Sequence, residues 1–265
     1  MKDYAWFKQY PDKIPHEIDP DRYSSLVDLF NQCVERYTDL PAFENFEKVL
    51  TYKDVDKLTR DFAAFLQKKG LQKGDRVAIQ LPNTLQYPVA LFGTLRAGLT
   101  VVNTNPLYTS REMKEKFQDS GVKAIVIMAN YASNLEEIIS STEIKTVITT
   151  EIGDLVGGLK GALINFVVKR IKKMVPRFNL PGAIKFKDAL TEGGKEKFTP
   201  VELTKNDIAF LQYTGGTTGV AKGAILKHKN IHHTRCLLPK SFLHNNILCR
   251  FDLYPFHKST FRGRL

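Results

Sequence analysis

The segment GDRVAIQLPNTLQYPVALFGTLRAGLTVVN, residues 74–103, decides the fold. Apolar runs at 77–81 and 100–103 predict two strands. Residues 84–97 between them predict a helix that ends at Gly98, because glycine adopts the left-handed conformation found just past many helices. A strand, a helix and a second strand in so short a stretch are typical of a β-α-β unit with parallel strands.

The same alternation continues on both sides of this unit. Thr109 and Glu112 have the spacing of a capping box, which predicts a helix that ends before Gly121, and an apolar strand is expected at 123–128. Further helices are expected at 25–36, 55–69 and 133–140, and further strands at 49–52 and 145–149. The pattern predicts an α/β fold in which a layered, mainly parallel β-sheet is flanked by helices.

The composition is that of an ordinary globular chain of one or two domains. The 265 residues are 43% hydrophobic and 25% charged, which argues against disorder, collagen and coiled coil. Three cysteines are too few for a disulfide framework and favour a reducing, cytoplasmic compartment. We expect no transmembrane helix and no signal peptide, because the chain has no long apolar run and residues 1–20 are polar and punctuated by prolines.

The net charge of +11 is unevenly distributed. Residues 226–265 hold eight Lys or Arg and one acid, a net of +7, so residues 1–225 carry only +4. The body also lacks a basic stripe with interleaved aromatic residues. Nucleic acid is therefore not expected as a partner.

A different pattern interrupts the alternation at residues 155–181. Helical periodicity runs from Leu155 to Val175 and stops at Pro176. One side of the helical wheel gathers Leu159, Leu163, Phe166, Val167, Ile171 and Met174. The other side carries Lys169, Lys172 and Lys173, while Lys160 and Arg170 blur the separation. Two interpretations stay open, a surface helix packed on the core or an interfacial helix held by anionic lipid. The candidate membrane-surface contacts are Lys169, Arg170, Lys172 and Lys173.

A glycine-rich loop follows a strand-like run late in the chain. Residues 206–213 (NDIAFLQY) predict a strand, and TGGTTGVAKG at 214–223 leads into the apolar residues 224–226. Four glycines let successive backbone N–H groups approach an anion, three threonines add hydroxyls, and Lys222 adds a positive charge. The loop matches neither the Walker A nor the Gly-x-Gly-x-x-Gly pattern. A plain hairpin needs only a glycine or two, so we favour polyphosphate binding.

The segment YTGGTTGVAKG at 213–223 resembles the phosphate-loop signature of adenylate-forming enzymes, the AMP-dependent synthetase and ligase superfamily. Other segments that resemble the family are LTY at 50–52, GDRVAIQLPN at 74–83, LRAG at 95–98 and VNTNPL at 102–107. Bacterial long-chain fatty acid–CoA ligases are the most similar group, on NPLYT at 105–109, LQY at 211–213 and VVKRIKKMVP at 167–176. The resemblance runs from about residue 20 to about residue 230.

The resemblance implies the N-terminal subdomain of the adenylate-forming fold and a two-step reaction. A fatty carboxylate attacks the α-phosphate of ATP, which gives acyl-adenylate and pyrophosphate, and the thiol of coenzyme A then displaces AMP. The loop would hold the β- and γ-phosphates, with Mg²⁺ neutralising charge. Lys222 would be an electrostatic contact and not the main catalytic lysine. The implied small-molecule partners are fatty acid, ATP and coenzyme A.

The candidate nucleotide-binding residues are those of the loop and its flanks. They are Tyr213, Thr214, Gly215, Gly216, Thr217, Thr218, Gly219, Val220, Ala221, Lys222, Gly223 and Ala224. No catalytic residue and no metal ligand is assigned.

The likeness ends at about Ile231, so we divide the chain into an AMP-binding part at 1–230 and an atypical tail at 231–265. The family's adenine-site motif, ribose-binding Asp and catalytic lysine are not found, and we expect the chain as written to form no acyl-CoA. We favour a frameshift or premature stop over two other interpretations of the tail, a genuine basic extension and a metal site. The metal site would use His232, His233, Cys236, Cys249 and His257.

Two other functions remain open. The chain could be a non-catalytic module that binds the inner face of the membrane through the basic helix and the basic tail. It could also be a fragment of an enzyme that adenylates another carboxylic acid, because the family builds its acyl pocket mostly from residues beyond 230. The sequence does not indicate the acyl chain length or the oligomeric state.

Overall fold

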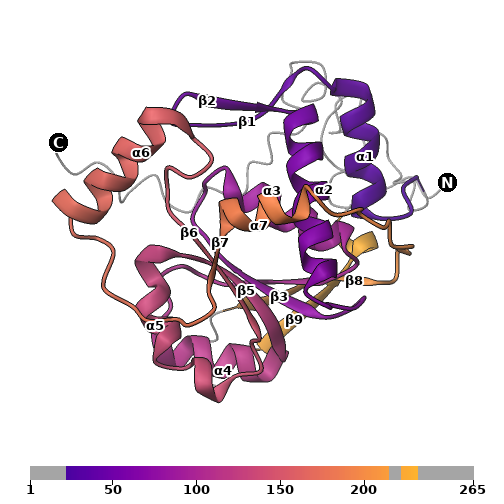
Figure 1. Ribbon diagram of the computed structural model, residues 1–265. Helices are drawn as coiled ribbons and strands as arrows, with labels where there is room; N and C mark the ends of the chain where they lie inside the picture. Colours follow the sequence, from indigo (N-terminus) through magenta and orange to yellow (C-terminus); the bar gives the residue numbers. More distant parts are fainter. Residues whose placement is uncertain (1–21, 215–221, 232–265) are drawn as a thin grey trace, which may run out of the picture.

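The computed structural model describes residues 22–214 and 222–231 (Figure 1). Within these residues a seven-stranded sheet has the order β7-β6-β5-β3-β4-β8-β9. Its strands are β3 (Arg76–Gln80), β4 (Thr100–Asn103), β5 (Val122–Met128), β6 (Thr146–Thr150), β7 (Ile184–Lys185), β8 (Ile208–Thr214) and β9 (Lys222–Lys227). Every neighbouring pair is parallel except β8 and β9, which are antiparallel. The predicted α/β fold with a mainly parallel sheet is confirmed.

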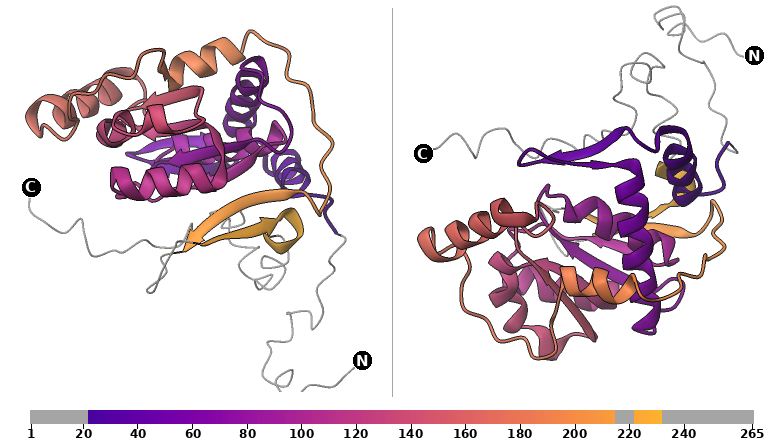
Figure 2. Two further views of the ribbon diagram at one scale, coloured as in Figure 1. Left: turned by 90° about the horizontal axis from the view of Figure 1, so that it is seen from below. Right: turned by 45° about the horizontal axis from the view of Figure 1, so that its top comes forward.

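Helices cover both faces of the sheet (Figures 1 and 2). The α-helices are α1 (Leu26–Tyr37), α2 (Tyr52–Lys68), α3 (Gln86–Arg96), α4 (Ser110–Ser120), α5 (Ala132–Glu136), α6 (Gly158–Phe166) and α7 (Phe186–Gly193). Short 3₁₀ turns are η2 (Ala129–Tyr131) and η3 (Ile139–Ser141), and a π-helical turn, η4 (Val167–Ile171), continues α6. A separate two-stranded hairpin consists of β1 (Pro41–Asn45) and β2 (Lys48–Thr51).

The two faces of the sheet belong to two apolar cores. In β3, Val77 and Ile79 join the core that contains residues of α1, α2, α3 and α7, whereas Ala78 between them joins the core under α4 and α5. In β5, Val126 and Ile127 divide between the same two cores. Strand side chains alternate between faces, so a strand covered on both sides is apolar at every position. This explains the continuous apolar runs of the sequence.

Predicted helix boundaries agree best where a capping signal exists. Thr109 and Glu112 form the expected capping box of α4, and Gly121 closes that helix with a φ of 59°. Gly98 follows α3 with a φ of 77°, as expected. The helix predicted at 55–69 begins three residues earlier, because Thr51 and Asp54 form a capping box that starts α2 at Tyr52.

Other predictions are corrected by the structure. The single helix expected from Leu155 to Val175 is the shorter α6, which passes into η4 at Val167. The helix expected at 133–140 divides into α5 and η3. The strands β1 and β7 and the helix α7 were not predicted. The two strands are short, and their few apolar residues give no clear period. In α7, Phe186, Ala189 and Leu190 have helical spacing, and this signal was missed. The tail from residue 232 lies outside the described residues.

Candidate functional site

Strands β8 and β9 hold the two ends of the glycine-rich loop. β8 runs parallel to β4, so its end at Thr214 lies at the carboxyl edge of the sheet, where parallel sheets bind their ligands. Thr214 is opposite Lys222 in the antiparallel register, and Tyr213 is opposite Gly223. The predicted strands on both sides of this segment are therefore confirmed. Of the candidate site residues, those from 215 to 221 lie outside the described residues.

Tyr213 fixes the end of β8 to the body of the protein. Its side chain is buried in the core under α4, and its hydroxyl donates a hydrogen bond to the carboxylate of Asp119 at the end of that helix. Burial, together with the neighbouring Asp119, raises the pKa of Tyr213 above its usual value. The phenol therefore stays protonated and continues to donate at neutral pH. Sequence reasoning placed Tyr213 in the site but missed Asp119.

Polar side chains link β8 to its neighbour β4 next to the loop. The amide of Asn103 donates to Gln212 Oε1 at 3.0 Å, and Tyr87 Oη donates to Asn103 Oδ1 at 2.8 Å. Burial raises the pKa of Tyr87 to about 12, so this donor is also permanently protonated. Because Asn103 and Gln212 are partners in the strand register, the side-chain bond reinforces the backbone pairing that positions the loop.

Lys222 begins β9 and is exposed, with no ion pair to any residue in the described ranges. Its ammonium group is thus available to an anion in the loop. Gly223 and Ala224 follow it in the strand, so these three predicted residues supply the frame on the C-terminal side.

The far end of β9 is anchored to α1. His228 is buried, and its Nδ1 accepts a hydrogen bond from the backbone N–H of Leu26 at 3.1 Å. The backbone N–H of His228 donates to the carbonyl of Asp207, whose carboxylate pairs with Lys73 at 3.0 Å. The hairpin that frames the loop is therefore fixed at its base across a long sequence separation. The sequence analysis did not identify this anchoring role of His228.

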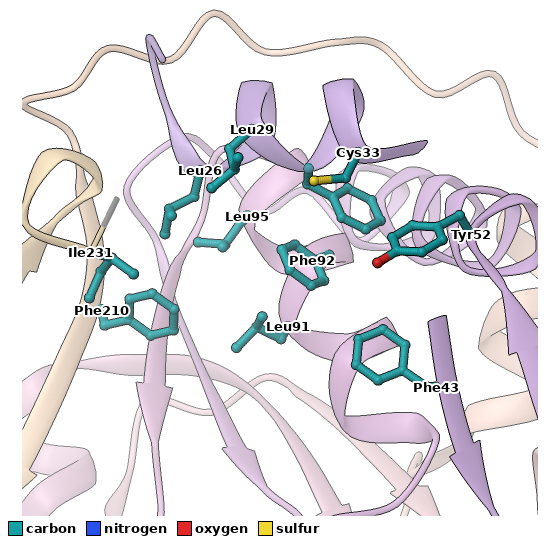
Figure 3. A pocket seen from close by; sticks show the side chains of 11 residues that line it. Leu26, Leu29, Cys33, Phe43, Tyr52, Leu91, Phe92, Leu95, Phe210 and Ile231 are labelled. Atoms are coloured by element: carbon teal, nitrogen blue, oxygen red, sulfur yellow. The ribbon is translucent and has the colours of Figure 1, made fainter. Parts of the chain in front are cut away.

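A small apolar pocket lies between α1, α3 and β8 (Figure 3). Its lining includes Leu26, Leu91, Leu95, Phe210 and Ile231. The space for a bound molecule is about 30 Å³, enough for about one water and far below the several hundred Å³ of typical ligand sites. This space is too small to hold an acyl chain.

The membrane-surface candidates lie together in η4 and directly after it. Lys169, Arg170, Lys172 and Lys173 are all exposed, but Lys169 pairs with Glu151 at 3.2 Å. The described residues contain no helix long and apolar enough to cross a membrane. Across the same ranges, no group of three or more His, Cys, Asp and Glu side chains is placed to hold a metal ion.

The model of the family described as AMP-binding enzyme matches residues 30–254, well over half of the sequence. The chain belongs to this family. The predicted resemblance to adenylate-forming enzymes is confirmed. The match runs past residue 231, where the recognisable motifs end, and the division at residue 230 stays a prediction.

Curated relatives of this AMP-binding family member include long-chain-fatty-acid–CoA ligases. The ligase of Escherichia coli O157:H7 is 55% identical over 228 residues, which cover 86% of this chain and 41% of the relative. The ligase of Bacillus subtilis strain 168 is 35% identical over 85% of this chain and 40% of the relative. The chain thus spans about two fifths of the length of these relatives.

Solved structures of adenylate-forming enzymes share the fold. An anthranilate CoA ligase in complex with anthranoyl-AMP has a TM-score of 0.65 at 16% identity, over 80% of this chain and 37% of its own. A long-chain-fatty-acid-CoA ligase from Archaeoglobus fulgidus has a TM-score of 0.62 at 23% identity, over 83% of this chain and 39% of its own. At these identities the likeness concerns the fold, and it confirms the expected fold class.

Proposed function

We propose that this chain is the phosphate-loop portion of a long-chain fatty acid–CoA ligase. The observation that carries the proposal is the glycine-rich loop between β8 and β9, in a chain 55% identical to a relative of that name. In the proposed reaction a fatty carboxylate attacks the α-phosphate of ATP, and acyl-adenylate and pyrophosphate form. The sulfur of coenzyme A then attacks the acyl carbon and releases AMP. Because the chain spans 41% of that relative, the proposal assigns to it only the phosphate-binding part of the reaction.

The geometry supports this role through three groups around the loop. Backbone N–H groups of the glycines would donate to the β- and γ-phosphate oxygens. Lys222 would add a positive charge from the first residue of β9. Tyr213, held by Asp119, keeps the end of β8 in place while the phosphates bind. None of these groups takes or gives a proton in the proposed chemistry, so their role is to bind and orient ATP.

Magnesium would enter this site with the nucleotide. Within the described ranges no carboxylate or imidazole cluster offers a resident metal site, so the ion would be coordinated chiefly by phosphate oxygens of MgATP. It would lower the charge of the triphosphate next to the loop. Mg²⁺ would thus be part of the substrate.

The substrate class is proposed as long-chain carboxylic acids. The names of the relatives in Escherichia coli and Bacillus subtilis support this choice over aryl or short acids. The pocket near α1 does not contribute, because it has room for about one water molecule only. This pocket is therefore not proposed as part of the acyl site.

Titration of MgATP into the purified 265-residue chain tests the proposal. The variant Lys222→Ala should bind MgATP about fivefold more weakly, because an exposed charge contact of about 1 kcal/mol is lost. Lys227→Ala, at the other end of the same strand, is the matched control and should bind as the wild type does. Equal affinity of the wild type and Lys222→Ala would contradict the assignment of Lys222. Absence of MgATP binding by the wild type would contradict the proposal as a whole.

A further inference from the structure

A short series of side-chain hydrogen bonds runs from α3 through β4 to β8. Tyr87 Oη donates to Asn103 Oδ1 at 2.8 Å, and Asn103 Nδ2 donates to Gln212 Oε1 at 3.0 Å. The hydroxyl of Tyr87 has no other hydrogen-bond partner among residues 22–214 and 222–231, and it packs beside the apolar core. An O–H left unpaired there is costly, so Tyr87 donates to Asn103. The oxygen of the Asn103 amide therefore faces Tyr87, and its nitrogen faces Gln212.

This series of bonds determines how the side-chain amide of Gln212 is oriented. Its oxygen accepts from Asn103, so its nitrogen lies on the other side of the amide group. Gln212 Nε2 has no hydrogen-bond partner in the part of the chain that the structure describes, and the residue is only half-buried. An amide nitrogen carries two N–H donors. Gln212 therefore presents two donors in a fixed direction, and both are available to an acceptor.

Gln212 and Lys222 lie on the same face of the hairpin that β8 and β9 form at one edge of the sheet (Figure 2). Gln212 is opposite Ala224 in the antiparallel register. Lys222 and Ala224 are two residues apart in β9, so their side chains point to the same face. Diagonal neighbours of this kind have Cβ atoms about 7–8 Å apart, which is within reach of long side chains. Ala224 is small and exposed, so it leaves space between the amide and the ammonium group.

We infer that Gln212 is a further phosphate contact, and that its amide nitrogen and the ammonium group of Lys222 bind one polyphosphate between them. Both groups donate hydrogen bonds, and phosphate oxygens accept them and carry the negative charge that Lys222 attracts. Tyr87 and Asn103 are positioning residues, because they turn the nitrogen of Gln212, and not its oxygen, toward the ligand. The inference rests on the proposed function and adds a contact from outside the candidate residues 213–224.

Titration of magnesium pyrophosphate and MgATP into the 265-residue chain tests the contact. Gln212→Glu keeps an oxygen for Asn103 but replaces the free donor by a negatively charged acceptor, so both ligands should bind about tenfold more weakly. Gln212→Met removes the donor without adding charge, and should weaken binding about threefold. The matched control is Gln72→Glu, the same change at an exposed position before β3, at the opposite edge of the sheet from the loop. This control should bind both ligands as the wild type does.

The positioning role is tested in the same titrations. In Asn103→Asp, the carboxylate accepts from Tyr87 and also from Gln212, so the amide of Gln212 turns and presents its oxygen to the ligand. Binding should weaken about tenfold although Gln212 itself is unchanged. Tyr87→Phe should weaken binding about twofold in the wild-type background and have no further effect in Gln212→Met, because Tyr87 acts only through Gln212. A general structural role of Tyr87 would weaken binding equally in both backgrounds.

Nuclear magnetic resonance of the wild type gives a second measurement that does not depend on the folding of a variant. The side-chain amide signals of Gln212, identified by their absence from the spectrum of Gln212→Met, should shift when magnesium pyrophosphate is added. If the wild type binds pyrophosphate but these signals do not shift, or if Gln212→Glu binds as tightly as the wild type, the inference is overturned and the proposed function stands. Unchanged binding in Asn103→Asp would overturn the positioning role. A wild type that binds neither ligand would overturn the proposed function and this inference together.

Discussion

Gly223 of β9 lies against the ring of Tyr213, its register partner in β8. A Cβ at Gly223 would be 3.0 Å from Cζ of that ring, closer than ordinary van der Waals contact. The ring cannot move away freely, because the hydroxyl of Tyr213 is bonded to Asp119 and the side chain is buried. Packing therefore favours glycine at this last position of the loop signature, independently of the proposed phosphate binding.

Gly223→Val should destabilise the chain by about 1–3 kcal/mol, because the added side chain overpacks the ring of Tyr213. The measurement is urea unfolding followed by circular dichroism. Ala224→Val at the next position is the control, since Ala224 is exposed and its side chain leaves the opposite face of the strand. If both variants unfold at the same urea concentration as the wild type, the contact is not as tight as described.

An ion pair between α2 and α3 should make stability fall in acid. Arg96 is buried and bonds to Asp56 at 2.5 Å. Burial by itself would raise the pKa of Asp56, but the hydrogen bonds from Arg96 and Arg60 outweigh burial and hold this pKa below its ordinary value. An unfolded aspartate has a pKa of about 3.9. Because the pKa of Asp56 is lower in the folded protein, its charge stabilises the fold fully at a pH above about 3.9. This stabilisation is lost as the pH falls through the pKa that Asp56 has in the folded state.

Asp56→Asn should therefore lower the free energy of unfolding by about 3 kcal/mol at neutral pH, because it leaves the buried Arg96 without its counterion. The cost should shrink in acid, where the wild type also loses the charge on Asp56. Asp61→Asn on the same helix is the control, because the partner of Asp61 is the exposed Lys57 and such pairs contribute at most about 1 kcal/mol. The measurement is the free energy of unfolding of both variants in denaturant, at neutral and at acid pH. If Asp56→Asn lowers this free energy equally at both pH values, the charge of Asp56 does not stabilise the fold as described.

The close approach of Gly161 to Gly153 should control whether α6 stays on the body. In Gly161→Val, the Cβ of the new side chain would lie 2.4 Å from the carbonyl oxygen of Gly153, which is too close. The helix should therefore detach locally from the body. Hydrogen exchange at residues 158–171 is expected to rise at least tenfold, while the amides of β3 and β5 exchange as in the wild type. Ala162→Gln, at the exposed neighbouring position, should leave exchange unchanged. Unaltered protection of α6 in Gly161→Val would show that the contact is not essential.

Local signals explain which parts of the fold could be predicted. The apolar runs of β3 and β5 and the capping box of Thr109 and Glu112 are properties of short segments, and each predicted its element correctly. The start of α2 was missed although the Thr51 and Asp54 signal was present. The strands β1 and β7 form by pairing with other strands, β2 and β6. A short segment of polar and apolar residues has no pattern from which such pairing can be predicted.

The candidate site was also only partly predictable from the sequence. The loop motif was visible because it is contiguous in sequence, and the structure confirms the strands on both sides of it. Asp119, Asn103 and His228 were missed, because each contributes only through a contact with a residue distant in the chain. The sequence also did not predict which way the apolar side of α6 faces, because periodicity identifies an apolar stripe but not the surroundings of that stripe.

The segment between β8 and β9 is proposed to bind the terminal phosphates of ATP. Titration of the wild-type chain with MgATP, magnesium pyrophosphate and AMP tests it most directly. Binding of MgATP and pyrophosphate with similar affinities, and much weaker binding of AMP, is the predicted result, because the loop is proposed to contact the β- and γ-phosphates. Binding of AMP as tight as that of MgATP, or no binding of pyrophosphate, would contradict the claim.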